Sequence, residues 1–271
     1  MTKATKQELA VITPEEQAYL DSLEAPGSSS GEYSGPARLE INVKSKDADG
    51  NKRTIGAWHI RGTDKYYDGE VIFRPVRHMY KLIRYNVDND VYTVAGQSIY
   101  FKEFSEEILD SMGTIALGRK FGKAYSDEER EATRKLAECY LEIFGFVTFG
   151  DAEPEPVVYR VRGKKLMKFL DAFRAVPKGK RFSQYAYKLT TDQPEGKTFW
   201  DINITPDLSK VLPLLPILKY DEEIMSHIQK DNLEVIASYK RNKNAATGAK
   251  LVEDNINEPL TINNDDSDLP F

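Results

Sequence analysis

The sequence predicts a strand-rich α+β protein built around a closed or partly closed antiparallel barrel. Segments in which apolar and polar residues alternate outnumber helical patterns, giving about seven or eight expected strands and two or three helices. Strands and helices do not alternate in the way that indicates a doubly wound sheet. No repeat of fixed period indicates a solenoid or a propeller.

The composition predicts an intracellular globular protein. The 271 residues are 40% hydrophobic and 11% aromatic, and no apolar run approaches the roughly 18 residues of a membrane-spanning helix. The single cysteine, Cys139, excludes a disulfide framework. The N-terminal residues lack the apolar stretch of a secretory leader, so we expect a reducing, cytoplasmic compartment.

Composition also divides the chain into three regions. Residues 1–36 are an N-terminal segment with a Gly/Ser/Pro linker, 37–241 a folded body, and 242–271 an acidic tail. A short helix is expected to start at Thr13–Glu16, where proline and two carboxylates follow a capping threonine. The tail has no apolar periodicity and is expected to be disordered.

Alternation predicts paired strands in the first half of the body. The expected strands are 37–43, 54–63, 79–87 and 91–101. Turn residues at Asp47–Asn51 and Asp88–Asp90 join them into two hairpins. Apolar residues within 76–87 also recur at helical spacing, so a helix is the alternative there.

The second half of the body mixes helices and strands. A helix should begin at Ser126, where Glu129 can complete a capping box. Strands are expected at 141–149, 157–161, 182–190 and 198–204, and helices at 163–176 and 221–239.

No catalytic constellation is recognisable. His59, His78 and His227 lie in three different element types, and one cysteine cannot complete a zinc pattern. Gly113–Lys120 has the glycine spacing of a phosphate-binding loop, but Arg and Lys replace its Lys and Ser/Thr. We therefore expect a protein that is not an enzyme and needs no cofactor or metal.

Charge is distributed unevenly along the chain. Residues 33–251 hold 36 basic and 31 acidic residues, a net charge of +5, whereas residues 252–271 hold six acidic residues and no basic one. A basic body between acidic ends is typical of a domain that binds a polyanion.

Basic and aromatic residues are interleaved in three stretches of the body. Single-stranded nucleic acid needs this composition, because bases stack on rings and phosphates pair with Lys and Arg. The expected DNA-binding residues are Arg74, Arg77, Tyr80, Lys81, Arg84, Tyr85, Arg119, Lys120, Phe121, Lys123, Lys180, Arg181, Tyr185, Tyr187, Lys188 and Trp200. The loop 118–123 has the best composition, since its glycines allow close backbone approach. We expect at least one of Tyr85, Tyr185 and Trp200 to be a core residue instead.

The chain ends in Asp265-Asp266-Ser267-Asp268-Leu269-Pro270-Phe271. This end resembles the C-terminal tip of bacterial single-stranded DNA-binding proteins and of their phage-encoded counterparts. The resemblance implies a tip that docks onto replication and repair proteins. The expected partner-binding residues are Asp265, Asp266, Asp268, Leu269, Pro270 and Phe271. The ring and terminal carboxylate of Phe271 suit an apolar slot beside a cation.

The order of basic-aromatic strands, the loop 118–122 and the late basic hairpin also resembles phage single-stranded DNA-binding proteins. The resemblance implies an OB-like, partly closed antiparallel barrel with inserted helices for residues 37–241. It implies a phage-encoded protein of the bacterial host cytoplasm that coats single-stranded DNA without sequence specificity during replication, recombination or repair. The chain lacks the zinc site of some phage relatives, so footprint and stoichiometry do not carry over.

Three other functions remain open at this stage. A strand-annealing recombination protein would bind two strands and assemble into rings or filaments. A metal-dependent nuclease could bring dispersed carboxylates together only in the fold. A structural virion or scaffold protein would have no affinity for nucleic acid.

Overall fold

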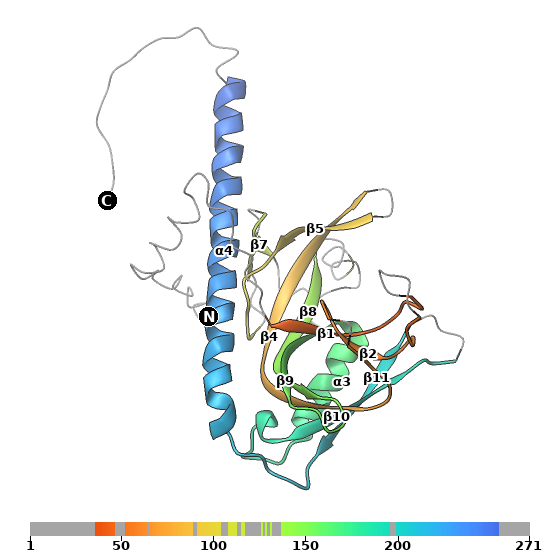
Figure 1. Ribbon diagram of the computed structural model, residues 1–271. Coiled ribbons are helices and arrows are strands. Elements are labelled where there is room, and N and C mark those ends of the chain that lie inside the picture. Colours follow the sequence, from red (N-terminus) through yellow and green to blue (C-terminus); the bar gives the residue numbers. More distant parts are fainter. Residues whose placement is uncertain are drawn as a thin grey trace.

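The computed structural model describes residues 36–46, 52–63, 65–88, 91–103, 108–112, 115–116, 126, 128, 131, 137–195 and 199–254. In this part the chain is a strand-rich α+β protein (Figure 1). Its helices are α3 (Gly163–Arg174), α4 (Leu215–Asp254) and the short 3-10 helix η2 (Phe182–Gln184). The strands are β1 (Ala37–Ile41), β2 (Trp58–Ile60), β3 (Tyr66–Tyr67), β4 (Val71–Asp88), β5 (Val91–Gln97), β6 (Ile108–Leu109), β7 (Ile115–Ala116), β8 (Glu138–Thr148), β9 (Glu155–Val161), β10 (Ala186–Asp192) and β11 (Asp201–Asp207).

Nine strands form one sheet in the order β11-β10-β4-β8-β9-β1-β2-β3, with β5 paired to the far end of β4. All neighbours are antiparallel except β1 and β9, which pair in parallel. The pairing ends at β11 on one side and at β3 on the other, so among the described residues the sheet is not closed. Strands β6 and β7 form a separate pair.

The sheet lies between the two long helices (Figure 1). Strand β8 shows how its two faces are divided, because successive side chains point to opposite sides. Leu141, Ile143 and Val147 join the larger core with α3, whereas Phe144 packs with Ile224 of α4. We call these sides the α3 face and the α4 face.

Strand β4 contains a bulge that decides which of its side chains reach α4. Its register with β8 shifts between Pro75 and Arg77, a place where proline is tolerated because the ladder is already interrupted. After the bulge, Arg77 lies opposite Phe144 on the α4 face and His78 lies opposite Ile143 on the α3 face. Residues 76–87 are thus a strand, and the helical alternative is wrong.

Most predicted elements are confirmed with shifted ends. Hairpins β1–β2, β4–β5 and β10–β11 all form, and β8, β9 and α3 lie where they were expected. The helix expected from Ser126 and the N-terminal segment lie wholly or mostly outside the described residues.

The C-terminal helix differs most from the expectation. It starts at Leu215 and continues to Asp254, so the expectation of disorder is wrong for residues 242–254. Ala245, Ala246 and Ala249 favour helix by intrinsic propensity although they form no amphipathic stripe. Within the described residues, neither helix has the length and apolar composition needed to cross a bilayer.

Candidate nucleic-acid interface

Two predicted DNA-binding cations of β4 hold α4 on the sheet. Arg77 donates through Nε and Nη2 to both oxygens of Asp221, at 2.7 and 2.6 Å. Lys81, only 2% exposed, forms an ion pair with Asp231. Their spacing along the strand matches two acidic residues along the helix, so the role of both cations is structural.

Arg74 and Arg84 also have protein partners. Arg74 donates through Nε to the Ser183 carbonyl at 3.3 Å and through Nη2 to the Pro213 carbonyl. Arg84 donates to the buried carboxylate of Asp110 at 2.8 Å. The first predicted basic stretch therefore anchors other segments of the fold.

Several predicted stacking residues belong to the core. Tyr185 and Tyr187 are buried on the α3 face, so the prediction that they contact bases is wrong. The burial of Tyr185 confirms the expectation that at least one of Tyr85, Tyr185 and Trp200 is a core residue. Tyr187 falls on the inner side of β10 together with Leu189. Tyr80 is half-buried on the same face, with its ring 5.6 Å from that of Phe101.

The remaining predicted residues fall into three groups. Tyr85 and Trp200 are half-buried: the Tyr85 hydroxyl is 3.1 Å from that of Tyr140, and the Trp200 ring lies against Gly56. Lys180, Arg181 and Lys188 are exposed, with Lys188 paired to Glu70. The loop residues Arg119, Lys120, Phe121 and Lys123 lie outside the described residues, as does the tip from Asp265 to Phe271.

A second basic surface, which no stretch of sequence predicted, lies on the α4 face of the sheet beside the helix. Strand alternation turns most of the buried apolar residues of β1, β2 and β9 toward α3 and leaves their polar neighbours, together with Val158, on the opposite side. We call this surface the arginine face. Its cations are Arg38, Arg53, Arg61, Arg160 and Arg162.

Aromatic rings lie between these arginines. His59 and Tyr66 stack with ring centroids 4.6 Å apart, and the Arg53 guanidinium lies 4.6 Å from the Tyr66 centroid. Arg160 and Arg162 lie 5.6 and 5.8 Å from the centroid of Tyr140. Rings and guanidinium groups thus meet at two places on this face, although its residues come from five separate strands and from the segments that follow them.

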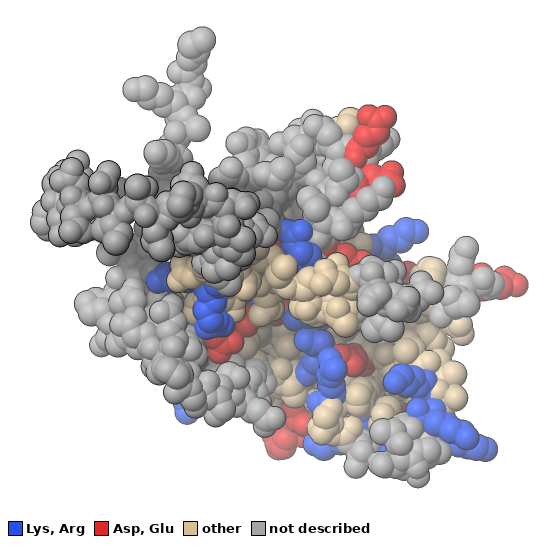
Figure 2. All heavy atoms as spheres, turned by 90° about the horizontal axis from the view of Figure 1, so that it is seen from above, with Lys and Arg blue, Asp and Glu red and all other residues tan. Residues whose placement is uncertain are grey.

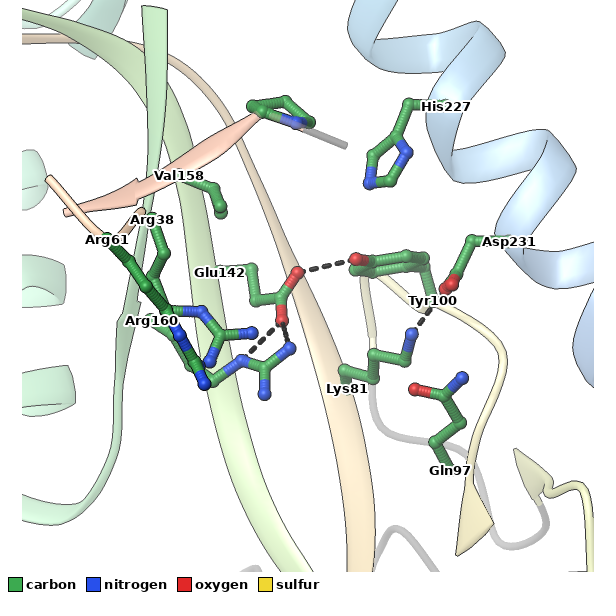
Figure 3. A pocket seen from close by; sticks show the side chains of 11 residues that line it. Arg38, Arg61, Lys81, Gln97, Tyr100, Glu142, Val158, Arg160, His227 and Asp231 are labelled. Atoms are coloured by element: carbon green, nitrogen blue, oxygen red, sulfur yellow. Dashed lines mark hydrogen bonds and ion pairs between the residues drawn. The ribbon is translucent and has the colours of Figure 1, made fainter. Parts of the chain in front are cut away.

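The arginine face deepens into a pocket where it meets α4. The pocket encloses about 310 Å³, and Figure 3 shows arginine side chains converging at one side and α4 forming the other. Its walls include Arg38, Arg61, Lys81, Tyr100, Glu142, Arg160, His227 and Asp231. Figure 2 shows Lys and Arg side chains at several places on the face seen from above, with acidic side chains between them.

Glu142 is the central acceptor of the pocket. Its carboxylate, 2% exposed, accepts hydrogen bonds from Arg160 Nε at 2.6 Å and from the Tyr100 hydroxyl at 2.5 Å (Figure 3). Burial alone would raise the pKa of Glu142, but Arg160, Lys81 and the Tyr100 hydrogen bond outweigh it and hold this pKa below its ordinary value. The ionised carboxylate therefore fixes the position of the Arg160 guanidinium.

The α4 wall is held by polar contacts. The backbone N–H of Tyr100 donates to Asn232 Oδ1 at 2.7 Å, and the Lys81 ammonium lies 4.4 Å from the centroid of the Tyr100 ring. Burial lowers the pKa of His227, and Asp231 and Glu142 only partly offset this effect. His227 therefore carries little charge at neutral pH.

Arg38 and Arg61 form the arginine side of the pocket. Within the described residues, the carboxylate that lies within 4 Å of both is that of Glu40, at 3.8 Å from Arg38 and 3.7 Å from Arg61, which exceeds hydrogen-bond distance. Burial lowers the pKa of Arg38, and the positive charge of Arg160 lowers it further. Both guanidinium groups therefore keep donors that can face a bound anion.

Sequence reasoning missed this site because its residues are distant in the chain. Arg38 and Arg160 are neighbours only because β1 pairs in parallel with β9, and no linear spacing signals that pairing. Among the described residues, no group of three or more His, Cys, Asp or Glu side chains is placed to hold a metal ion. Comparisons with protein-family models, curated proteins and solved structures give no match for this chain.

Proposed function

We propose that the protein binds single-stranded DNA without sequence specificity and coats it during replication, recombination or repair. The observation that carries the proposal is the arginine face, where guanidinium groups lie beside partly exposed rings. Arginines pair with backbone phosphates, while any base can stack on a ring or on a guanidinium plane. Binding of this kind depends on charge and stacking and not on base identity.

Accessibility also supports this use of the surface. The side chains of Arg61 and Arg162 are 63% and 57% exposed, so a polyanion can reach them without moving the sheet. Arg162 also forms an ion pair, with Glu138, but both side chains of that pair are accessible to solvent, whereas the β4 cations Arg77 and Lys81 are paired with α4 and are only 22% and 3% exposed. We therefore assign the DNA path to the strands β3, β2, β1 and β9, and not to β4.

The proposal extends to the type of fold and to the C-terminal tip. The sheet is an OB-like, partly closed barrel, which is supported by the strong curvature of β4 in Figure 1 and by the return of β1 alongside β9. The tip from Asp265 to Phe271 recruits replication or recombination proteins, which is supported by its acidic residues and terminal ring. A phage origin and action in the bacterial cytoplasm belong to the same proposal.

A salt titration tests the proposal directly. Fluorescence anisotropy of a labelled dT oligonucleotide, a duplex and an RNA should give the tightest binding to the single-stranded DNA. Its affinity should fall with salt at a slope of about −0.7 per neutralised phosphate. Equal affinity for the duplex, or no dependence on salt, would contradict the proposal.

A matched pair of variants localises the interaction. Arg162→Gln removes a cation of the arginine face and should reduce the slope by about one phosphate. Arg174→Gln removes a similarly exposed arginine from α3; Arg174 pairs with Asp171 on the surface, as Arg162 pairs with Glu138. This control should bind like the original chain.

A further inference from the structure

The charges that line the pocket do not balance within the described residues. Its lining includes four permanent cations and only two carboxylates, Glu142 and Asp231. Each carboxylate is already engaged, Glu142 by Arg160 and Asp231 by Lys81. Glu40, which lies near both remaining arginines but is not part of the lining, carries one charge and cannot compensate both of them. A positive excess in a concave site favours a bound anion.

The two remaining arginines are held next to each other by the backbone. The N–H of Arg61 donates to the carbonyl of Arg38 at 2.8 Å, so the side chains start from adjacent positions. Figure 3 shows their guanidinium groups close to that of Arg160. Because Glu142 fixes Arg160 from the other side, three planar forks converge on one part of the pocket.

We propose that this pocket binds a phosphate ester, with Arg38 and Arg61 donating to its oxygens and Arg160 supporting them at close range. Arginine forks match phosphate oxygens in pairs, and a volume of about 310 Å³ accommodates one nucleotide. The phosphate can come from the backbone of single-stranded DNA or from a terminal or free nucleotide. The first source rests on the proposed function, whereas the second does not.

The ligand needs no rearrangement of the arginine side. The ionised carboxylate of Glu142 accepts hydrogen bonds from both Arg160 and Tyr100, so the Arg160 guanidinium is already held in place before a ligand binds. Such preorganisation lets the interaction energy appear as affinity. The bound oxyanion also reduces repulsion between adjacent guanidinium groups.

Binding of dTMP to the full chain tests the pocket. Isothermal titration should detect dTMP and inorganic phosphate but not thymidine, since only the first two carry the charge. Arg38→Gln and Arg61→Gln should each weaken dTMP binding by about tenfold or more, as expected for a lost charged hydrogen bond. Arg61→Lys keeps the charge without the fork and should lose part of the affinity. Arg174→Gln is the control. The proposal is overturned if both Gln variants bind dTMP as tightly as the original chain does. It is also overturned if the original chain does not bind dTMP and the variants keep the DNA affinity of the original chain.

A second measurement distinguishes the sources and separates this inference from the proposed function. A dT oligonucleotide with a 5′-phosphate should bind several-fold tighter than one without it if the pocket holds a terminal phosphate. Equal binding of the two, with a salt slope reduced by one to two phosphates in the Gln variants, assigns the pocket to the backbone. If the chain binds dTMP but not the oligonucleotides, the proposed function alone is contradicted. If the chain binds DNA normally and the Gln variants change the affinity for no ligand, the pocket alone is contradicted.

Discussion

Lys81 of β4 and Asp231 of α4 form an ion pair in which the two side chains are only 3% and 17% exposed. Apolar residues of α4, among them Ile217, Tyr220, Ile224 and Ile228, pack against the sheet around this pair. A buried charge of each sign therefore fixes the helix at one place on the sheet. The helix is a fixed wall of the pocket and not a loosely attached tail.

Removing one partner of this pair should destabilise the protein strongly. Asp231→Ala leaves the ammonium of Lys81 buried without its carboxylate, and the free energy of unfolding should fall by about 3–5 kcal/mol. Asp221→Ala should cost less because its partner Arg77 is 22% exposed. Urea unfolding measures both, and equal losses would show that the pair is not effectively buried.

Gly56 and Gly62 form a matched pair for a test of Trp200. Both have a positive φ, +89° and +84°, so alanine at either position meets the same backbone strain, about 1–2 kcal/mol. A Cβ at Gly56 would lie 2.3 Å from the Trp200 ring, whereas one at Gly62 meets nothing within 4 Å. Thermal unfolding should therefore show a larger loss for Gly56→Ala, by roughly 1–3 kcal/mol. In the background Trp200→Ala the two glycine substitutions should have similar effects.

Stability should decrease as the pH falls below about 6.5. Burial lowers the pKa of His78 and of His227 from an ordinary value of 6.5, so between these folded values and 6.5 the unfolded chain binds more protons. The free energy of unfolding then falls as the solution is acidified through this window. Urea midpoints at pH 7.5 and 5.5 measure the effect, and the double variant His78→Phe/His227→Gln should flatten it. The pKa of Glu142 is also lowered, so Glu142 stabilises the fold at neutral pH. This stabilisation is lost only at lower pH, where carboxylates become protonated.

Two tyrosines should respond differently when DNA binding is measured. Tyr66 lies on the arginine face, and Tyr66→Ala should weaken binding of a dT oligonucleotide by the value of one stacked base, about 1–3 kcal/mol. Tyr185 lies in the core, and Tyr185→Phe should change the affinity less than about twofold. The reverse order of effects would place the DNA on the other face of the sheet.

Deletion of Asp265–Phe271 should leave DNA affinity unchanged or raise it, most clearly at low salt. The six acidic residues from Glu253 to Asp268 should compete weakly with DNA for the basic body, and the deletion removes three of them. Phe271→Ala keeps these charges, so it should leave DNA affinity unchanged while abolishing capture of replication proteins from a bacterial lysate. A deletion that prevents DNA binding would show that the tip is part of the binding fold.

The strand pattern could be predicted because alternation is a local property. In each of the hairpins β1–β2 and β4–β5, the second strand is the next strand along the chain, and the turn residues lie between the two. The end of α4 could not be found in this way, because residues after Asn242 have helix propensity without an apolar stripe.

The candidate site was predicted less well because composition does not reveal pairing. The basic stretch around Arg77 and Lys81 looks like a DNA surface in sequence, yet its partners on α4 follow 144 and 150 residues later. Conversely, Arg38 and Arg160 lie in strands whose sequences do not predict a basic surface, and the parallel pairing of β1 with β9 brings them together. Long-range pairing thus decided which cations are structural and which are available.

The parallel pairing of β1 with β9 also has a consequence for the order of folding. Ala37 is opposite Val157, so a growing chain completes the hairpin β1–β2 well before the strand that must lie beside it is synthesised. Closing so long a loop is costly in entropy, which slows the step and leaves one edge of β1 open in the meantime. We therefore expect the N-terminal hairpin to join late a sheet that starts from β8 and β9, which are adjacent in the chain, and from β4. A nascent chain that stops before residue 155 should remain sensitive to protease at β1.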